Sequence, residues 1–209
     1  MQDPENNVYT MGFFFTGTKG REKATYFGTV GNLVLSDPGT RRWTGNGPLV
    51  RDSGGKAIGR FVYAYYVDTP FFDTFGLVKL NKGTRYSPSV CHFGGPTGVY
   101  KGLSLSPAQM QFYGHSILFS DLFPARTGMA LETTDPEQVA MIGPAPVFQS
   151  GLGDDGAPVL TGGQAVGFMT AAVVAGTQDG IQVRRITPLV NKAQKATGIK
   201  LTLLTAKPL

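Results

Sequence analysis

The stretch Gly153-Asp154-Asp155-Gly156-Ala157-Pro158 decides the fold that we expect for this chain of 209 residues. Its glycines and proline favour a tight loop, and the apolar residues that follow at 159–160 and 165–174 are typical of strands. Adjacent carboxylates at Asp154 and Asp155 suggest a cation site, but no regular spacing of further oxygen ligands accompanies them. We therefore expect no metal at this loop and no cofactor in the chain.

The loop resembles the Gly-Asp-Ser-Gly-x-Pro signature of the trypsin/chymotrypsin-like serine proteases, with Asp155 in the place of the serine. The acyl-enzyme chemistry of that family needs a hydroxyl that a neighbouring imidazole can deprotonate. A carboxylate cannot supply that hydroxyl. The resemblance therefore predicts a nucleophile loop without its nucleophile.

The resemblance also places the other two members of the catalytic triad upstream, because the chain order in this family is His, Asp, Ser. Residues 28–33 are similar to the family's histidine segment, with Asn32 in the histidine position. Residues 74–80 are similar to the strand that the catalytic aspartate opens, with Thr74 in the aspartate position and Asp73 one residue early. Side chains alternate faces along a strand, so we expect Asp73 to point away from the site unless a bulge re-aims it.

All three catalytic positions are thus changed, while the residues around them match the family. Leu33 also stands where the family has the cysteine that accompanies the histidine. We interpret the chain as a pseudoprotease, a homologue without enzymatic activity. Other segments resemble the secreted trypsin-like proteins of actinobacteria, namely residues 88–98, 113–115, 124–126 and 197–204.

The predicted fold is all-β, a pair of six-stranded antiparallel barrels with a short C-terminal helix. Glycine accounts for 29 of the 209 residues, which fits many tight turns. We expect the first barrel at 1–87, the second at 88–186, and the helix and tail at 187–209. The helix is indicated by Thr187 as a cap, Pro188 at the first position and Gly198 as a terminator. Strand candidates are residues 9–16, 24–30, 58–67, 76–80, 159–160 and 165–174.

The resemblance implies roles for further residues of the site. Asp154 is expected to be buried and paired with a cationic group, which keeps the loop in shape. The backbone N–H groups of Gly153 and Asp155 form the family's oxyanion hole, and we hypothesise that the Asp155 carboxylate folds into it. Gln149 is expected near the base of the specificity pocket, with Thr170 and Ala171 in one wall.

Two further patterns suggest chemistry that we do not expect. The run Asp52-Ser53-Gly54-Gly55 spells part of the protease signature, but its place between two strands favours a hairpin turn. Cys91 and His92 are neighbours in a predicted strand, so they would point to opposite faces and could not share a proton. We expect Cys91 to be a small buried residue and His92 and His115 to be structural.

The formal charge of +5 lies mainly in the first part of the chain, where eleven Lys and Arg stand against seven acids up to Tyr86. Lys19, Arg21 and Lys23 fall in a predicted hairpin, and Arg41 and Arg42 precede the lone Trp43. A stacking aromatic beside basic residues is compatible with nucleic-acid binding. The charge is small and scattered, so we expect solvated hairpin tips and no nucleic-acid partner.

These observations favour a structural or binding subunit with a protein partner or a homo-oligomeric assembly, such as a decoration or tail component of an actinobacterial phage virion. The sequence has no apolar run long enough to span a membrane and no apolar signal-peptide core at residues 1–7, and its single cysteine forms no internal bridge. We expect synthesis in a cytoplasm. The alternatives are a secreted pseudoprotease that binds peptides or proteins in its cleft, and a hydrolase with a non-standard mechanism.

Overall fold

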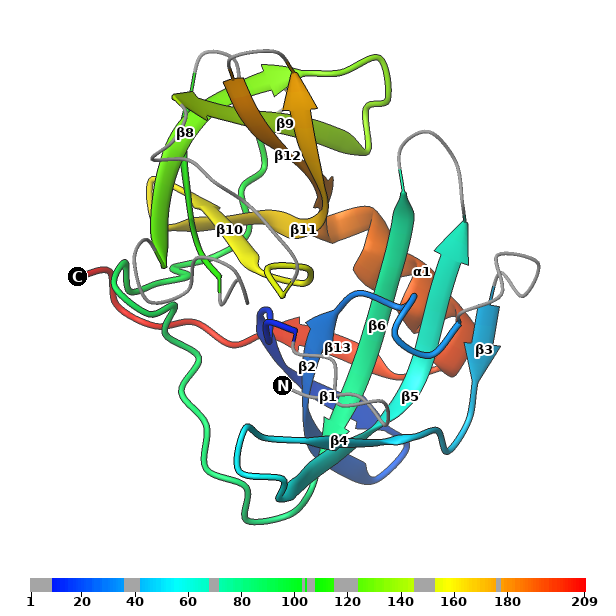
Figure 1. Cartoon of the computed structure of the whole chain (residues 1–209). Helices are drawn as coiled ribbons and strands as arrows, with labels where there is room; N and C mark the ends of the chain where they lie inside the picture. The colour runs from blue at the N-terminus through cyan, green and yellow to red at the C-terminus, as the bar shows by residue number, and fades with distance from the viewer. Residues whose placement is uncertain are drawn as a thin grey trace.

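The computed structural model describes residues 9–35, 42–67, 72–102, 104, 108–114, 124–144, 153–175 and 178–209. These residues form two β units, drawn one above the other in Figure 1, with a helix packed against strands of both. The fold is mostly β, as the alternating apolar runs predict.

The first unit is an open sheet of seven strands. It consists of β1 (Phe14–Lys19), β2 (Glu22–Thr29), β3 (Arg42–Thr44), β4 (Leu49–Arg51), β5 (Ala57–Val67), β6 (Asp73–Leu80) and β13 (Lys200–Leu203). The strand order is β13-β1-β2-β6-β5-β3, and β4 also pairs with β5. The unit thus differs from the six-stranded barrel that we expected, because β3 and β4 share one partner and β13 adds a strand beside β1.

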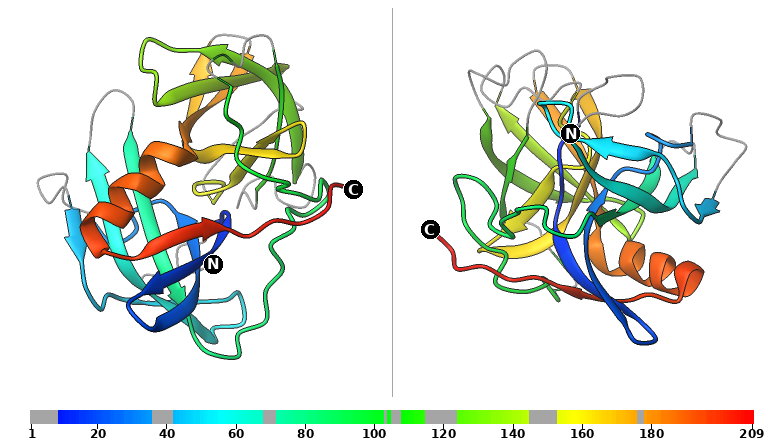
Figure 2. Two further views of the ribbon diagram at one scale, coloured as in Figure 1. Left: turned by 180° about the vertical axis from the view of Figure 1, so that it is seen from behind. Right: turned by 90° about the horizontal axis from the view of Figure 1, so that it is seen from below.

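The pairing of β13 with β1 ties the end of the chain back to its beginning. Phe15 pairs with Leu203, and Thr18 pairs with Lys200. Figure 2 shows the carboxyl-terminal segment running along the first unit before it reaches the second. The last strand of the chain, which falls in the segment 187–209 assigned to the helix and tail, therefore completes the first sheet.

The second unit is a closed barrel, as predicted. Its strands are β7 (Gln109–Tyr113), β8 (Ala125–Glu132), β9 (Gln138–Pro144), β10 (Pro158–Thr161), β11 (Gln164–Ala175) and β12 (Gln178–Arg185). Their order around the barrel is β10-β11-β12-β9-β8-β7. The barrel has its own buried apolar cluster, which includes Met110, Phe112, Val159 and Ile181.

Aromatic side chains from both units meet in a shared core. Phe168 of β11 packs edge-on against Phe13, with ring centroids 5.5 Å apart, and lies 5.2 Å from the ring of Phe75 in β6. All three are almost completely buried. Burying each such side chain stabilises the fold by about 2–3 kcal/mol, so this cluster holds the two units together.

Helix α1 (Ile186–Thr197) follows β12 directly. Its start was predicted wrongly: Arg185 is the N-cap residue and makes no side-chain capping bond, so Thr187 lies inside the helix. Its end is as predicted, because Gly198 adopts the left-handed conformation at φ 70° and its N–H donates to the carbonyl of Gln194 at 2.9 Å. Ile186, Leu189 and Ala193 bury the apolar stripe.

The connection between the units corrects the prediction for Cys91 and His92. The amides of Phe93 and Gly94 both donate to the carbonyl of Val90, so residues 91–93 form a turn and not a strand. His92 has a φ of 70°, and both His92 and Cys91 are exposed. Cys91 is therefore not the buried residue that we expected.

The hairpin turn predicted at Asp52 is confirmed. The Asp52 carboxylate accepts from the amides of Gly54 at 3.0 Å and Lys56 at 2.9 Å, and the turn joins β4 to β5.

Candidate functional site

The end of β2 and the start of β6 bring Asn32 and Thr74 together. The hydroxyl of Thr74 accepts from the backbone N–H of Gly31 at 2.8 Å and of Asn32 at 3.1 Å, and it lies 3.3 Å from the side-chain oxygen of Asn32, to which it donates. The chain turns sharply here, with the amide of Val34 donating to the carbonyl of Gly31. Thr74 thus holds the backbone of this turn through one buried hydroxyl.

Gly31 is required at this turn by close packing. A Cβ atom at this position would lie 2.4 Å from the carbonyl oxygen of Tyr65 and 2.5 Å from that of Phe75. Any larger residue would push the turn away from β5 and β6, and Asn32 with it.

The neighbouring carboxylate of Asp73 points away from this pair. It pairs with Lys192 of the helix at 2.9 Å and lies 3.6 Å from the Nε of Arg184 in β12. The ladder between β5 and β6 is regular at Val67–Asp73 and Tyr66–Thr74, so no bulge re-aims the side chain. Because side chains alternate faces along the strand, the Asp73 side chain points toward the contact between the two units.

The loop before β10 is fixed by a buried ion pair. The guanidinium of Arg126 in β8 donates through both terminal nitrogens to the Asp154 carboxylate, at 3.1 Å for Nη2, and neither side chain is exposed. Arg126 also lies over the ring of Phe112, 4.8 Å from its centroid. The sequence did not identify Arg126 as this partner, since the two residues are 28 positions apart and no local pattern links β8 to the loop before β10.

The same loop is tied to the segment before β1. The amide of Thr10 donates to the carbonyl of Asp155 at 3.2 Å, and its hydroxyl donates to the carbonyl of Gly153 at 2.8 Å. The hydroxyl of Thr29 at the end of β2 donates to the carbonyl of Thr10 at 3.2 Å. Thr10 thereby connects the loop to the strand that leads to Asn32.

Burial, and to a lesser extent the negative charge of Asp154, raise the pKa of the Asp155 carboxyl to about 7. Within the described residues, no N–H donates to this carboxylate. The hypothesis that Asp155 folds onto amide donors therefore has no hydrogen bond to support it. Around neutral pH the side chain exchanges between its charged and neutral forms.

Of the predicted pocket residues, Thr170 and Ala171 lie on β11 at a shift in its register with β12. The Thr170 hydroxyl is buried and has no hydrogen-bond partner within the described part of the chain. Gln149 and His115 lie outside the described residues.

The described residues contain no group of three or more His, Cys, Asp or Glu side chains that could hold a metal ion. They also contain no helix with the length and apolar character needed to cross a membrane.

The chain resembles solved proteases over nearly its whole length. It is similar to protease A of Thermobifida fusca (TM-score 0.58, 17% identity, covering 94% of this chain and 92% of the other). It is also similar to a chymotrypsin of Cellulomonas bogoriensis (0.54, 16%, 95% and 97%) and to the Nocardiopsis protease (0.53, 13%, 91% and 90%). No protein-family model and no curated protein matches the sequence.

At these identities the likeness concerns the fold alone. Together with the closed barrel, the open sheet and the carboxyl-terminal helix, it shows that this chain has the trypsin-like serine protease fold.

Proposed function

We propose that this protein is a non-enzymatic binding or structural subunit built on the trypsin-like fold. The observation that carries the proposal is the hydrogen bonding of Thr74. Its hydroxyl is committed to the amides of Gly31 and Asn32 and to the Asn32 side chain, which has no basic nitrogen to accept a proton. Proton relay to a nucleophile needs such a base.

The loop that follows supports the same proposal. Asp155 stands where the resemblance implies a serine, and a carboxylate offers no hydroxyl for an acyl-enzyme. The buried Arg126–Asp154 pair and the contacts of Thr10 nevertheless hold the loop in one shape. These internal contacts fix the loop independently of any catalytic group, which suits a surface used for binding.

Fluorophosphonate labelling tests the absence of serine nucleophile chemistry. We expect no labelled serine in the wild-type protein under conditions that label an active trypsin-like protease stoichiometrically. A triple variant, Asn32→His, Thr74→Asp and Asp155→Ser, tests whether the site geometry still supports the chemistry, and we expect it to be labelled. Stoichiometric labelling of any serine in the wild-type protein would refute the proposal.

Size-exclusion chromatography with light scattering tests the subunit role. We expect the protein to form a homo-oligomer or to co-purify in a defined ratio with a partner protein. The narrower role, a decoration or tail component of an actinobacterial phage virion, predicts a closed symmetric assembly. A monomer that binds no protein at any concentration would count against both the subunit role and the narrower virion role.

A second candidate function is peptide binding in the cleft, favoured by the buried hydroxyl of Thr170 on β11, which has no hydrogen-bond partner among the described residues. An unpaired buried hydroxyl is costly and is satisfied when a ligand supplies its partner. The test is binding of an extended peptide to the wild type and to two variants. Weaker binding by Thr170→Val, with unchanged binding by the exposed-site variant Lys200→Gln, would support this candidate over the first.

A further inference from the structure

We propose that a groove beside the cleft binds a single-chain amphiphile with a carboxylate head, of the fatty-acid class. The groove has a volume of about 460 Å³ and runs between the segment before β1 and the connection between the two units. The described residues that line it do not include Asn32, Thr74 or Asp155. The proposal therefore stands apart from the function proposed for the cleft.

The walls of the groove are mainly apolar. Phe14 and Tyr86 form one wall, with stacked rings whose centroids are 5.0 Å apart. Aliphatic side chains contributed by several elements complete the lining, namely Ile58, Leu80, Val90 and Pro158. Cavities of this size and character usually take small apolar ligands with a few fixed polar groups.

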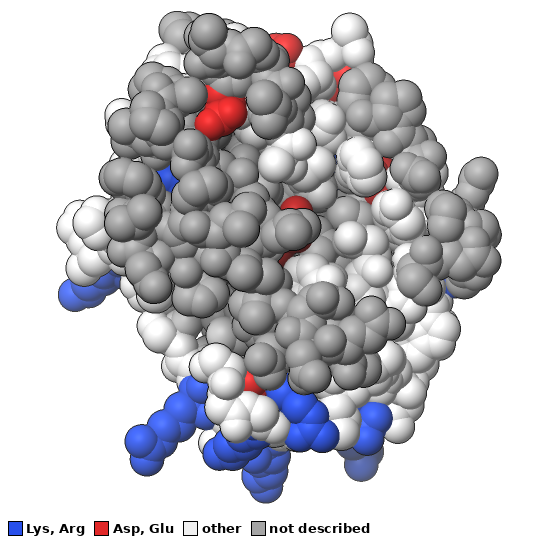
Figure 3. Space-filling view, in the orientation of Figure 1, with Lys and Arg blue, Asp and Glu red and all other residues white. Residues whose placement is uncertain are grey.

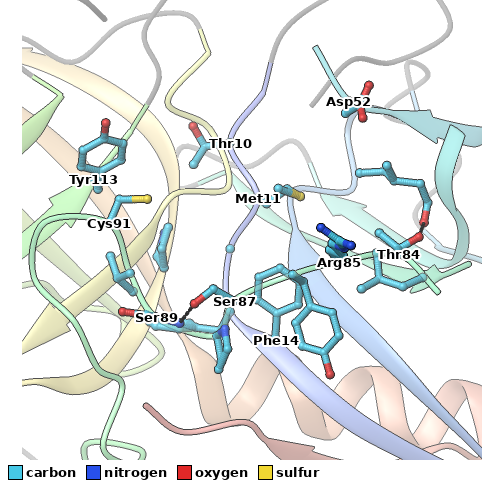
Figure 4. A pocket seen from close by; sticks show the side chains of 18 of the residues that line it. Thr10, Met11, Phe14, Asp52, Thr84, Arg85, Ser87, Ser89, Cys91 and Tyr113 are labelled. Carbon is cyan, nitrogen blue, oxygen red and sulfur yellow. Dashed lines mark hydrogen bonds between the residues drawn. The ribbon is translucent and has the colours of Figure 1, made fainter. Parts of the chain in front are cut away.

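One charge in the groove lacks a partner. Figure 4 shows the guanidinium of Arg85, an exposed residue of the groove lining, between Met11 and Thr84. Arg85 makes no hydrogen bond or ion pair with any described residue. The carboxylate of Asp52, which also lines the groove, accepts from two amides of its own turn. Arg85 is the only cationic side chain among the described lining residues, so it is the group able to bind an anion.

The surroundings of Arg85 add positive potential. The amide of Asn81 donates to the carbonyl of Ile58, and its side chain donates to the carbonyl of Ala57 at 3.0 Å, which brings the turn after β6 against the start of β5. Lys56 and Lys82 are exposed on these adjoining turns. Figure 3 shows Lys and Arg side chains gathered at this end of the molecule. Such a field favours an anionic head over a cationic or neutral one.

The far end of the groove holds a natural reporter. Cys91 is the only cysteine of the chain, is exposed and lines the groove, and in Figure 4 it lies with Tyr113 across the groove from Arg85. A chain whose carboxylate is bound by Arg85 would run past Met11 toward this thiol. Occupancy can therefore be read from the rate of thiol modification.

The test uses dodecanoate below its critical micelle concentration as the probe, with the full chain. We expect dodecanoate to slow the reaction of Cys91 with a disulfide reagent and to bind in calorimetry, while dodecyltrimethylammonium does neither. Arg85→Gln should weaken dodecanoate binding about tenfold, as expected for loss of a charged hydrogen bond. Lys82→Gln removes an exposed charge outside the lining and should change the affinity for dodecanoate less than about twofold.

Met11→Trp, at an exposed position that lines the groove, should fill the space and abolish binding without affecting the core. The proposal fails if dodecanoate neither protects Cys91 nor releases or absorbs heat. It also fails if the cationic amphiphile binds equally well, or if Arg85→Gln binds like the wild type.

Discussion

At the scale of single residues, the carboxyl of Asp155 makes the stability of the fold depend on pH. In the unfolded chain an aspartate ionises near pH 4, whereas burial and Asp154 raise the pKa of Asp155 in the fold to about 7. Because folding raises this pKa, the folded protein binds the proton of Asp155 more tightly than the unfolded chain does. The resulting stabilisation is fully present below the unfolded pKa and is lost as the pH rises through the folded pKa. The cost of charging Asp155 therefore appears between about pH 4 and pH 7.

We predict that Asp155→Asn stabilises the protein in a pH-dependent way. The gain over the wild type should be small near pH 4, grow to about pH 7 and then level off, with a ceiling of about 4 kcal/mol that partial exposure reduces. Urea denaturation across this pH range measures it. Asp155→Ser, also neutral, should give the same profile, and a gain that does not vary with pH would contradict the prediction.

The buried pair of Arg126 and Asp154 gives a second prediction at this scale. Asp154→Asn leaves the guanidinium without its countercharge and should cost about 3–5 kcal/mol in the free energy of unfolding. Replacing both, Arg126→Met with Asp154→Leu, should cost less than the sum of the two single changes. A double-mutant cycle in urea measures the coupling, and additive costs would show that the pair is not coupled.

At the scale of elements, the end of helix α1 depends on one glycine. Gly198 has a φ of 70°, where a side chain is strained. We predict that Gly198→Ala lowers the free energy of unfolding by about 1 kcal/mol, and that Gly198→Asn costs less because asparagine tolerates this conformation. Thermal unfolding of both variants tests the order, and equal costs would contradict it.

The strands and the helix end could be predicted because their signals are local. Alternating apolar residues predicted β2, β5, β6 and β11, and a terminal glycine predicted the end of α1. The turn at Cys91 was missed because it depends on bonds from Phe93 and Gly94 to Val90 that override a strand-like composition. The pairing of β13 with β1 and of Arg126 with Asp154 joins residues far apart in the sequence, and no local pattern encodes such partners.

At the scale of the whole molecule, polar and apolar contacts both join the two units. Asp73 of the first unit pairs with Arg184 of the second and with Lys192 of the helix. Lys192 also pairs with Glu137, at 2.9 Å. Burial lowers the pKa of Lys192, but its hydrogen bonds to Glu137 and Asp73 outweigh this and raise it. The carboxylate of Asp73 thus helps to hold the molecule together.

The shared aromatic core predicts that the two units unfold as one. Phe168 belongs to the barrel, but its ring packs on Phe13 and Phe75 beside the first sheet. Trp43, the only tryptophan, lies in β3 of that sheet and reports on it by fluorescence. We predict that Phe168→Ala costs about 3–5 kcal/mol and shifts the Trp43 transition together with the circular dichroism transition.

The matched control is Val183→Ala, which removes a buried side chain from the barrel's own cluster. If the units are coupled, this change should also lower the midpoint seen by Trp43, by a smaller amount that follows its smaller volume. Separate units would behave differently: the Trp43 midpoint would stay at its wild-type value in Val183→Ala while the circular dichroism transition split in two. Coincident transitions in both variants would mean that the aromatic core and the ion pairs of Asp73 make one cooperative body of the open sheet and the barrel.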